Sequence, residues 1–149
     1  MKNTIKSIIL TTVLSLGLVQ AASAEASSCT SNDCKHMAEA VYHEARGEGR
    51  QGMIAVASVI KNRTTERNMS AARVVQQRGQ FSYRTKRNLG FSDKKSYEAA
   101  RSIAYGVMNN TIRDNTGGAT YFRSGGGSWG KNFRQTARIG SHVFFKPRR

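Results

Sequence analysis

Apolar side chains recur every three or four positions in three long stretches of the chain, which is the spacing of a helix that buries one face. The first stretch predicts a helix over residues 34–46, with Asn32 or Asp33 as its N-terminal cap. Its apolar positions are Met37, Ala40, Val41 and Ala45. Gly47 and Gly49 follow at once, so we expect the helix to end there.

Residues 51–63, "QGMIAVASVIKNR", are apolar nearly all round, which predicts the buried central helix of the domain. Residues 70–77 predict a short helix that is capped by its first serine. Residues 93–110 predict a third long amphipathic helix, opened by Ser92 or Asp93.

The pattern changes after residue 115, where glycine alternates with aromatic residues. We expect a short strand at 119–123, a flexible glycine loop that carries Trp129, and a second strand over 138–147 that ends at Pro147. Two such strands can pair beside the helices. The predicted fold class is therefore α+β, mainly helical, in a single domain with a small β-sheet.

Residues 1–24 predict a secretory signal peptide. Two lysines precede an apolar run of about 13 residues, and Ala22 and Ala24 offer a cleavage site made of small residues. The alternative is a retained membrane anchor. We expect export to the periplasm or cell envelope, with a flexible lead-in at 25–36 and the folded domain at 37–149.

Charge narrows the class of partner. Cleavage after Ala24 removes two of the 24 Lys and Arg residues and none of the 9 acids, which leaves a net charge of +13. Such a charge favours a polyanion: nucleic acid, an acidic membrane face, or cell wall polymer. Export argues against nucleic acid, so we expect anionic polymers of the cell envelope to bind the basic surface.

The two cysteines, Cys29 and Cys34, lie just ahead of the first predicted helix. In an oxidising compartment they are expected to close a short loop as a disulfide. The alternative is two free thiols in a flexible segment.

The stretch "VYHEARGEGRQG" carries His43 and Glu44, which begin the H-E-x-x-H zinc motif. The second histidine is missing, because Gly47 stands in its place, and neither His36 nor His142 completes the spacing. A zinc site of this type needs two histidine ligands on one helix, and the chain supplies only one, so we exclude it. We expect neither a metal nor a cofactor.

Glu44 lies at the end of the first helix beside apolar residues. There its pKa is expected to rise, so that it holds a proton near neutral pH and donates it to a leaving group. A solvated surface glutamate is the plainer interpretation. Glu48, four residues on, is either the second carboxylate that glycoside cleavage usually needs or a favourable charge at the start of the next helix. Because two glycines flank Glu48, we expect it to point away from Glu44.

A single carboxylate still suffices to cut peptidoglycan when the substrate supplies the nucleophile. The C6 hydroxyl of muramic acid attacks its own C1, while the same glutamate first donates and then accepts the proton. The product is a 1,6-anhydro sugar, and the activity is that of a lytic transglycosylase.

Four blocks of the chain, "AEAVYHEARGEGRQGMIAVASVIKNR", "GQFS", "ATYFRSGGGSW" and "IGSHVFF", resemble the spore-cortex-lytic, SleB-like family of cell wall hydrolases. The resemblance runs in order and spacing from Met37 to Phe145. It implies a lysozyme-like catalytic domain that cleaves the MurNAc–GlcNAc backbone of peptidoglycan, with Glu44 as the catalytic glutamate. The loop "SGGGS" before Trp129 departs from the family pattern, where we expect a proline-containing stretch.

The aromatic residues of the later blocks are candidates for a sugar-binding groove. The predicted substrate-binding residues are Gln80, Phe81, Ser82, Tyr121, Phe122 and Trp129. For Phe81 and Phe122 the alternative is a place in the core. His142 and Glu48 are auxiliary candidates, and His142 precedes the apolar "VFF", which favours a structural role.

Two other functions stay open. An N-acetylmuramoyl-L-alanine amidase usually needs a zinc site, which these histidines do not supply. A non-enzymatic basic binder of envelope polymers or nucleic acid is supported by charge alone. We expect a monomeric enzyme that acts on the glycan strands of peptidoglycan.

Overall fold

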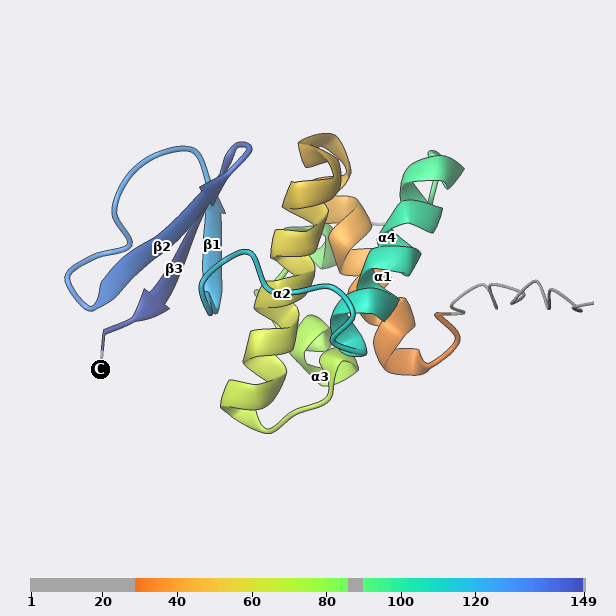
Figure 1. Cartoon of the computed structure of the whole chain (residues 1–149), viewed down its shortest axis with the longest axis horizontal. Helices are drawn as coiled ribbons and strands as arrows, with labels where there is room; N and C mark the ends of the chain where they lie inside the picture. Colours follow the sequence, from red (N-terminus) through yellow and green to blue (C-terminus); the bar gives the residue numbers. More distant parts are fainter. Residues whose placement is uncertain (1–28, 86–89, 149) are drawn as a thin grey trace, which may run out of the picture.

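The computed structural model describes residues 29–85 and 90–148, so the predicted signal peptide at 1–24 lies outside the described residues. The described part is a helical body with a three-stranded antiparallel sheet on one side of it (Figure 1). The elements in chain order are α1 (Asn32–Ala45), the 3-10 turn η1 (Arg46–Glu48), α2 (Gly49–Arg67), α3 (Ala71–Gln76), the 3-10 turn η2 (Ser82–Thr85), α4 (Lys94–Met108), β1 (Tyr121–Ser124), β2 (Phe133–Ile139) and β3 (His142–Pro147). This confirms the predicted mainly helical α+β class.

The helix α1 begins earlier than predicted. Ser31 caps it, because its hydroxyl accepts a hydrogen bond from the backbone N–H of Cys34 at 3.2 Å. Asp33 is not the cap of its own helix. Its carboxylate accepts a hydrogen bond from the backbone N–H of Ala72 at 2.8 Å, in the first turn of α3.

The predicted flexible lead-in at 25–36 is wrong for its described part. Residues 32–36 are helical, and Cys29 is buried and joined to Cys34 by a disulfide with a Cα–Cα distance of 5.3 Å. The disulfide and the serine cap together fix the chain just before α1. A disulfide stabilises the native state mainly by limiting the unfolded chain.

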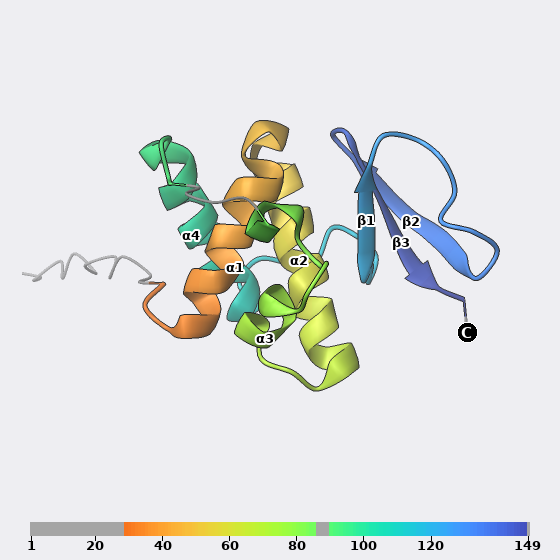
Figure 2. The same ribbon diagram turned by 180° about the vertical axis from the view of Figure 1, so that it is seen from behind.

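The central helix is α2, as the sequence predicts. It is buried over most of its length, with α1 and α4 on one side and the sheet on the other (Figure 1). Seen from behind, α3 lies against α1 and α2 (Figure 2). Among residues 29–85 and 90–148, no helix is both long and apolar enough to span a bilayer.

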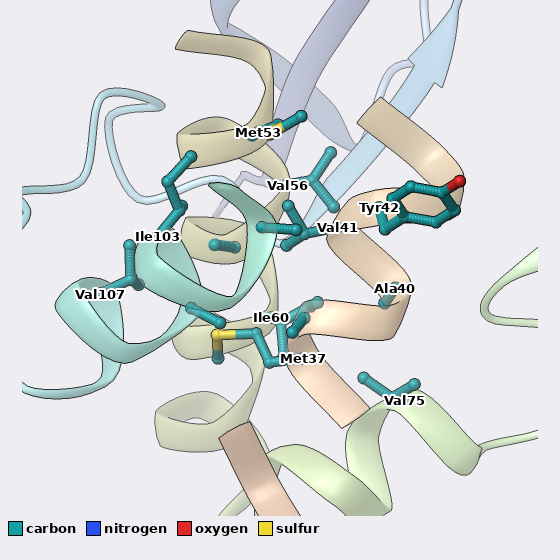
Figure 3. Close-up of a cluster of buried hydrophobic side chains, with 14 of the residues drawn as sticks. Met37, Ala40, Val41, Tyr42, Met53, Val56, Ile60, Val75, Ile103 and Val107 are labelled. Carbon is teal, nitrogen blue, oxygen red and sulfur yellow. The ribbon is translucent and has the colours of Figure 1, made fainter. Parts of the chain in front are cut away.

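The main core lies between α1, α2 and α4, as Figure 3 shows. Met37 and Val41 of α1, Val56 and Ile60 of α2, and Ile103 of α4 are all essentially inaccessible to solvent. Full burial of each such side chain contributes about 1.5–3 kcal/mol relative to exposure. The helical body therefore has a core of its own without the sheet.

The second predicted strand is wrong in its bounds, because residues 138–147 contain a turn. Gly140, with φ +57°, and Ser141 separate β2 from β3. Glycine adopts such a φ at no steric cost, because it has no Cβ. The sheet order is β1-β3-β2, so β3 pairs with both neighbours, and the predicted strand at 119–123 is β1 at Tyr121–Ser124.

A second, smaller cluster docks the sheet on α2. Ala55 and Val59 of α2 pack with Ala119 and Phe144, all with no exposed surface. Phe122 of β1 is partly buried and packs against both this cluster and the main core. The position of the sheet relative to the helices therefore depends on few side chains.

Candidate active site

Glu44 lies in the last turn of α1 and is partly buried. Its neighbours Val41 and Ala45 belong to the main core, and its carboxylate oxygen Oε1 is shielded from solvent. The helix ends at Ala45, one residue later, because the chain turns through η1 into Gly49, whose φ is +67°. The local sequence thus places one carboxyl group at the edge of an apolar surface, at the junction of two helices.

An aromatic wall lies beside Glu44. Tyr83 of η2 is 6 % exposed, and burial, followed by the nearby charge of Glu39, raises the pKa of its hydroxyl well above the usual range. The charge of Glu44 makes a smaller contribution in the same direction. The ring of His43 stacks on Tyr83 with centroids 4.7 Å apart. Burial lowers the pKa of His43, so at neutral pH it is an uncharged ring.

Glu48 holds the sheet to the helical body. Its Oε2 accepts a hydrogen bond from the backbone N–H of Ser141 at 2.7 Å, and its Oε1 accepts one from the Ser141 hydroxyl at 2.5 Å. Two glycines make room for it: a Cβ on Gly52 would lie 2.3 Å from the Glu48 Cβ, and one on Gly140 would lie 2.1 Å from Oε2. Glu48 occupies the cap position of α2, but the predicted contact of its side chain with that helix end is absent.

We expect Glu48→Gln to lower stability only where the carboxylate is charged. The hydrogen bonds from the Ser141 side chain and backbone hold the pKa of Glu48 below its ordinary value of 4.5. A group whose pKa is lowered by folding stabilises the protein above the unfolded pKa and loses that effect as pH falls through the folded pKa. The loss should be about 1 kcal/mol at pH 7, since the site is partly solvated.

Thermal unfolding of the two proteins between pH 7 and pH 3 measures this difference. It should be largest above about pH 5 and shrink below the ordinary pKa of 4.5. Glu98→Gln is the matched control, because Glu98 makes only an exposed ion pair with Arg101 at 3.1 Å. A difference in melting temperature that does not change with pH would contradict this account.

Arg63 is the site residue that the sequence analysis misses. It is 4 % exposed, and its Nε donates a hydrogen bond to the backbone carbonyl of Thr120 at 2.6 Å. Its guanidinium carbon lies 5.7 Å from the ring centre of Phe81 and 5.6 Å from that of Tyr121. Burial, then the charge of Arg67, lowers the pKa of Arg63 to about 10, so it stays charged at neutral pH.

This arginine of the central helix contacts two segments that the sequence analysis assigns to the sugar groove. The 80–85 segment, the start of β1 and the second half of α2 meet at its side chain. Its Nη1 has no hydrogen-bond partner among the described residues. In the sequence, Arg63 is only a basic residue that follows the apolar "ASVI" stretch. Basic residues are common near the C-terminal end of a helix, so this pattern does not single out Arg63 as a site residue.

The structure separates the predicted substrate-binding residues into two groups. Phe81 is 2 % exposed and belongs to the main core, so it presents no face to a sugar. Phe122 is partly buried between the sheet and the helices. The Oε1 of Gln80 accepts a hydrogen bond from Nη1 of Arg67 at 3.4 Å, and Ser82 is exposed on η2. The core alternative for Phe81 therefore holds, because the ring fills the space between Arg63 and Tyr83.

Tyr121 and Trp129 lie together at the sheet. Their ring centres are 5.6 Å apart, and Trp129 also packs near Phe133 and Phe145. Trp129 remains 36 % exposed. Tyr121 touches both this cluster and Arg63, so it is the link between the exposed tryptophan and the helical body.

The three histidines do not form a common site. His36 pairs with Glu39 at 3.5 Å, His43 lies in the aromatic wall, and His142 is 3 % exposed under Phe122. Burial lowers the pKa of His142. Within the described ranges, no three His, Cys, Asp or Glu side chains come together as a metal site.

Comparison with known proteins places this geometry in a family. Residues 47–145 match the family described as Cell Wall Hydrolase, so the match begins just after Glu44. A spore cortex-lytic enzyme from Halalkalibacterium halodurans is 36 % identical over 126 residues, which cover 76 % of this chain and 34 % of that protein. The chain thus spans about a third of the length of this curated relative.

Solved structures agree with the fold. The catalytic domain of the germination-specific lytic transglycosylase SleB from Bacillus anthracis is 31 % identical, with a TM-score of 0.61 over 78 % of this chain and 96 % of that one. The catalytic domain of the Bacillus cereus SleB protein has the same identity and TM-score over 77 % and 90 %. With its mostly helical body and small sheet, this chain is an enzyme of the cell wall hydrolase family and has the lysozyme-like fold of the SleB catalytic domain.

Proposed function

We propose that this chain cleaves the MurNAc–GlcNAc backbone of peptidoglycan as a lytic transglycosylase, with Glu44 as its single acid and base. The observation that carries the proposal is the unequal setting of two nearby carboxylates. Glu44 lies at the edge of the core beside Tyr83, whereas both oxygens of Glu48 accept hydrogen bonds from Ser141. The apolar setting of Glu44 supports a role in proton transfer, whereas Glu48 is engaged in holding the sheet.

The reaction needs no second carboxylate. Glu44 donates its proton to the glycosidic oxygen, and the bond between that oxygen and C1 of MurNAc breaks. The C6 hydroxyl of the same MurNAc forms a bond to C1 and gives its proton to the Glu44 carboxylate. The products are a free GlcNAc hydroxyl and a 1,6-anhydro-MurNAc end, and Glu44 is protonated again.

The other described carboxylates support the single-carboxylate proposal. Inverting and retaining glycosidases need a second carboxyl group about 5–9.5 Å from the acid. Asp33, Asp93 and Asp114 accept hydrogen bonds from backbone N–H groups of nearby turns or helix starts. Glu39 and Glu98 form ion pairs with His36 and Arg101. Glu66 lines a pocket between α2 and the sheet.

The location follows from the substrate. We propose that the chain is exported and acts in the periplasm or cell envelope, as the predicted signal peptide at 1–24 suggests. The spore cortex named for the curated relative is a peptidoglycan layer, and a related wall substrate is proposed here. The basic surface favours adsorption to the anionic wall.

Digestion of purified sacculi, followed by mass spectrometry of the soluble products, tests the class of bond that is cut. We expect muropeptides in which the peptide stems remain attached to the sugars, with and without EDTA. Free stem peptides, lost on EDTA treatment and restored by zinc, would establish an amidase instead. Binding to sacculi without soluble products would establish a non-enzymatic binder.

A further inference from the structure

A pocket of about 770 Å³ lies between the second half of α2 and the sheet. Asn62, Thr65 and Glu66 of α2 form one wall. The other wall is formed by Gly118 and Thr120, just before β1, and by the paired ends of β2 and β3. Figure 1 shows that the sheet lies beside α2. Glu44 and Glu48 do not line it, so it is separate from the proposed catalytic carboxyl group. The volume is that of a small-ligand site.

The sheet wall of the pocket is strongly basic. Arg134 of β2 and Lys146 of β3 are direct partners in the antiparallel register, and Arg148 lies two residues after Lys146. Like charges directly opposite each other on neighbouring strands destabilise a sheet. None of the three pairs with a carboxylate among the described residues, because the ion pairs found there are His36–Glu39 and Arg101–Glu98. An anion in the pocket would offset this repulsion.

Thr120 supplies an independent sign of a ligand. It lines the pocket and is only 5 % exposed, and its hydroxyl Oγ1 has no hydrogen-bond partner within the described ranges. A buried hydroxyl without a partner destabilises the folded state. The charged Arg63 lies directly behind it, bound to the Thr120 carbonyl. The backbone of Thr120 is therefore held in place, and its hydroxyl, which has almost no accessible surface, reaches a bound group by rotation of the side chain.

We propose that this pocket binds a carboxylate-bearing peptide stem of peptidoglycan, an inference that rests on the proposed wall substrate. Arg134, Lys146 and Arg148 receive the carboxylates, and the Thr120 hydroxyl donates to one of them. Glu66 on the opposite wall suits a ligand that also carries a free amine, as stem peptides with a diamino acid do. A phosphate polymer without amines has no group that pairs with Glu66, although the three cations attract it.

The test measures binding rather than cleavage. The synthetic stem tripeptide alanyl-γ-glutamyl-diaminopimelate is titrated into the purified full chain, and the amide NMR signals of Gly118 and Thr120 are followed. We expect saturable shifts that are lost when the carboxylates of the peptide are amidated. Inorganic phosphate and a glycerol phosphate polymer should shift these signals at much higher concentration only. Binding of the phosphate polymer without binding of the peptide would overturn the proposal.

Two variants of equal charge make the test specific to the pocket. The double variant Arg134→Gln with Lys146→Gln should weaken peptide binding about tenfold or more, because it removes two charge-assisted hydrogen bonds. Lys131→Gln with Arg138→Gln removes the same charge from exposed positions that do not line the pocket, and should leave binding within about twofold. Equal losses in the two variants would show a diffuse charge effect and overturn the proposal.

Thr120→Val separates binding from structure. The change keeps the shape of the side chain and removes only the hydroxyl, so the folded state should be as stable as before or more stable. Peptide binding should weaken about three- to tenfold. Unchanged binding would remove Thr120 from the site. A chain that cuts glycan but shows no peptide-dependent shifts refutes this inference alone, whereas one that binds the peptide without cutting glycan refutes only the proposed function.

Discussion

Glu44→Gln should lower the rate of sacculus lysis by about 10²–10⁴-fold while leaving the fold intact. The amide has nearly the shape of the acid, but it cannot donate a proton to the glycosidic oxygen or take one from the C6 hydroxyl. Glu44 is partly buried at the end of α1, where its side chain is close to Tyr83. No described carboxylate lies free beside it to take over the proton transfer, since Glu48 is bound to Ser141.

The measurement is turbidity loss of purified sacculi, at equal concentrations of folded protein judged by circular dichroism. Glu39→Gln is the matched control, because Glu39 lies on the same helix, is also partly buried, and pairs with His36. The control should retain most of the activity. A folded Glu44→Gln protein with more than about a tenth of the wild-type rate would remove Glu44 from the chemistry.

Phe144→Ala should cost about 3–5 kcal/mol of stability, the second large effect we expect. Phe144 has no exposed surface and is the only large side chain in the small cluster that docks the sheet on α2 within the described structure. Removing it leaves a cavity between two layers that few other contacts hold together. The contacts of Ser141 with Glu48 and of Thr120 with Arg63 depend on the same docking.

Urea unfolding of the two proteins checks this prediction. Phe133→Ala is the control, since Phe133 lies on the same sheet, is partly exposed, and packs beside Tyr121 and Trp129. Phe133→Ala should lower the free energy of unfolding by less than half as much as Phe144→Ala. Equal costs for the two variants would mean that the contact between sheet and α2 is not the weak point of the fold. Phe144→Ala should also lose lytic activity at a temperature where the wild type is active.

Helices were predictable because their signals are local. The run "GMIAVASVI" is enough to predict that α2 is buried. Ser70 and Asp93 cap the helices that follow them, as predicted. The exception is the cap of α1, because Asp33 binds Ala72, 39 positions away. Most of β2 was missed because its charged residues hide the alternation, and its last two residues were joined to β3 because Gly140 looks like part of a strand.

The site was predictable only where it depends on one helix end. The place of Glu44 follows from the apolar spacing of α1 and the glycines after it. The engagement of Glu48 with Ser141 joins residues 93 positions apart, and that of Arg63 with Thr120 joins residues 57 apart. No spacing in the sequence indicates such pairs. Phe81 shows the same limit, because an aromatic residue in a polar loop turned out to lie in the core.

The central claim, cleavage by one carboxylate with the substrate as nucleophile, is tested most directly by the mass of the new sugar ends. Soluble products from purified sacculi are treated with borohydride, which reduces any free reducing end, and their masses are measured by mass spectrometry. The account predicts muramic ends that are lighter by one water than hydrolysed ends and that take up no hydrogen, in the wild type and in Glu48→Gln alike. Reducing muramic ends in the wild type, together with a folded but inactive Glu48→Gln protein, would contradict it.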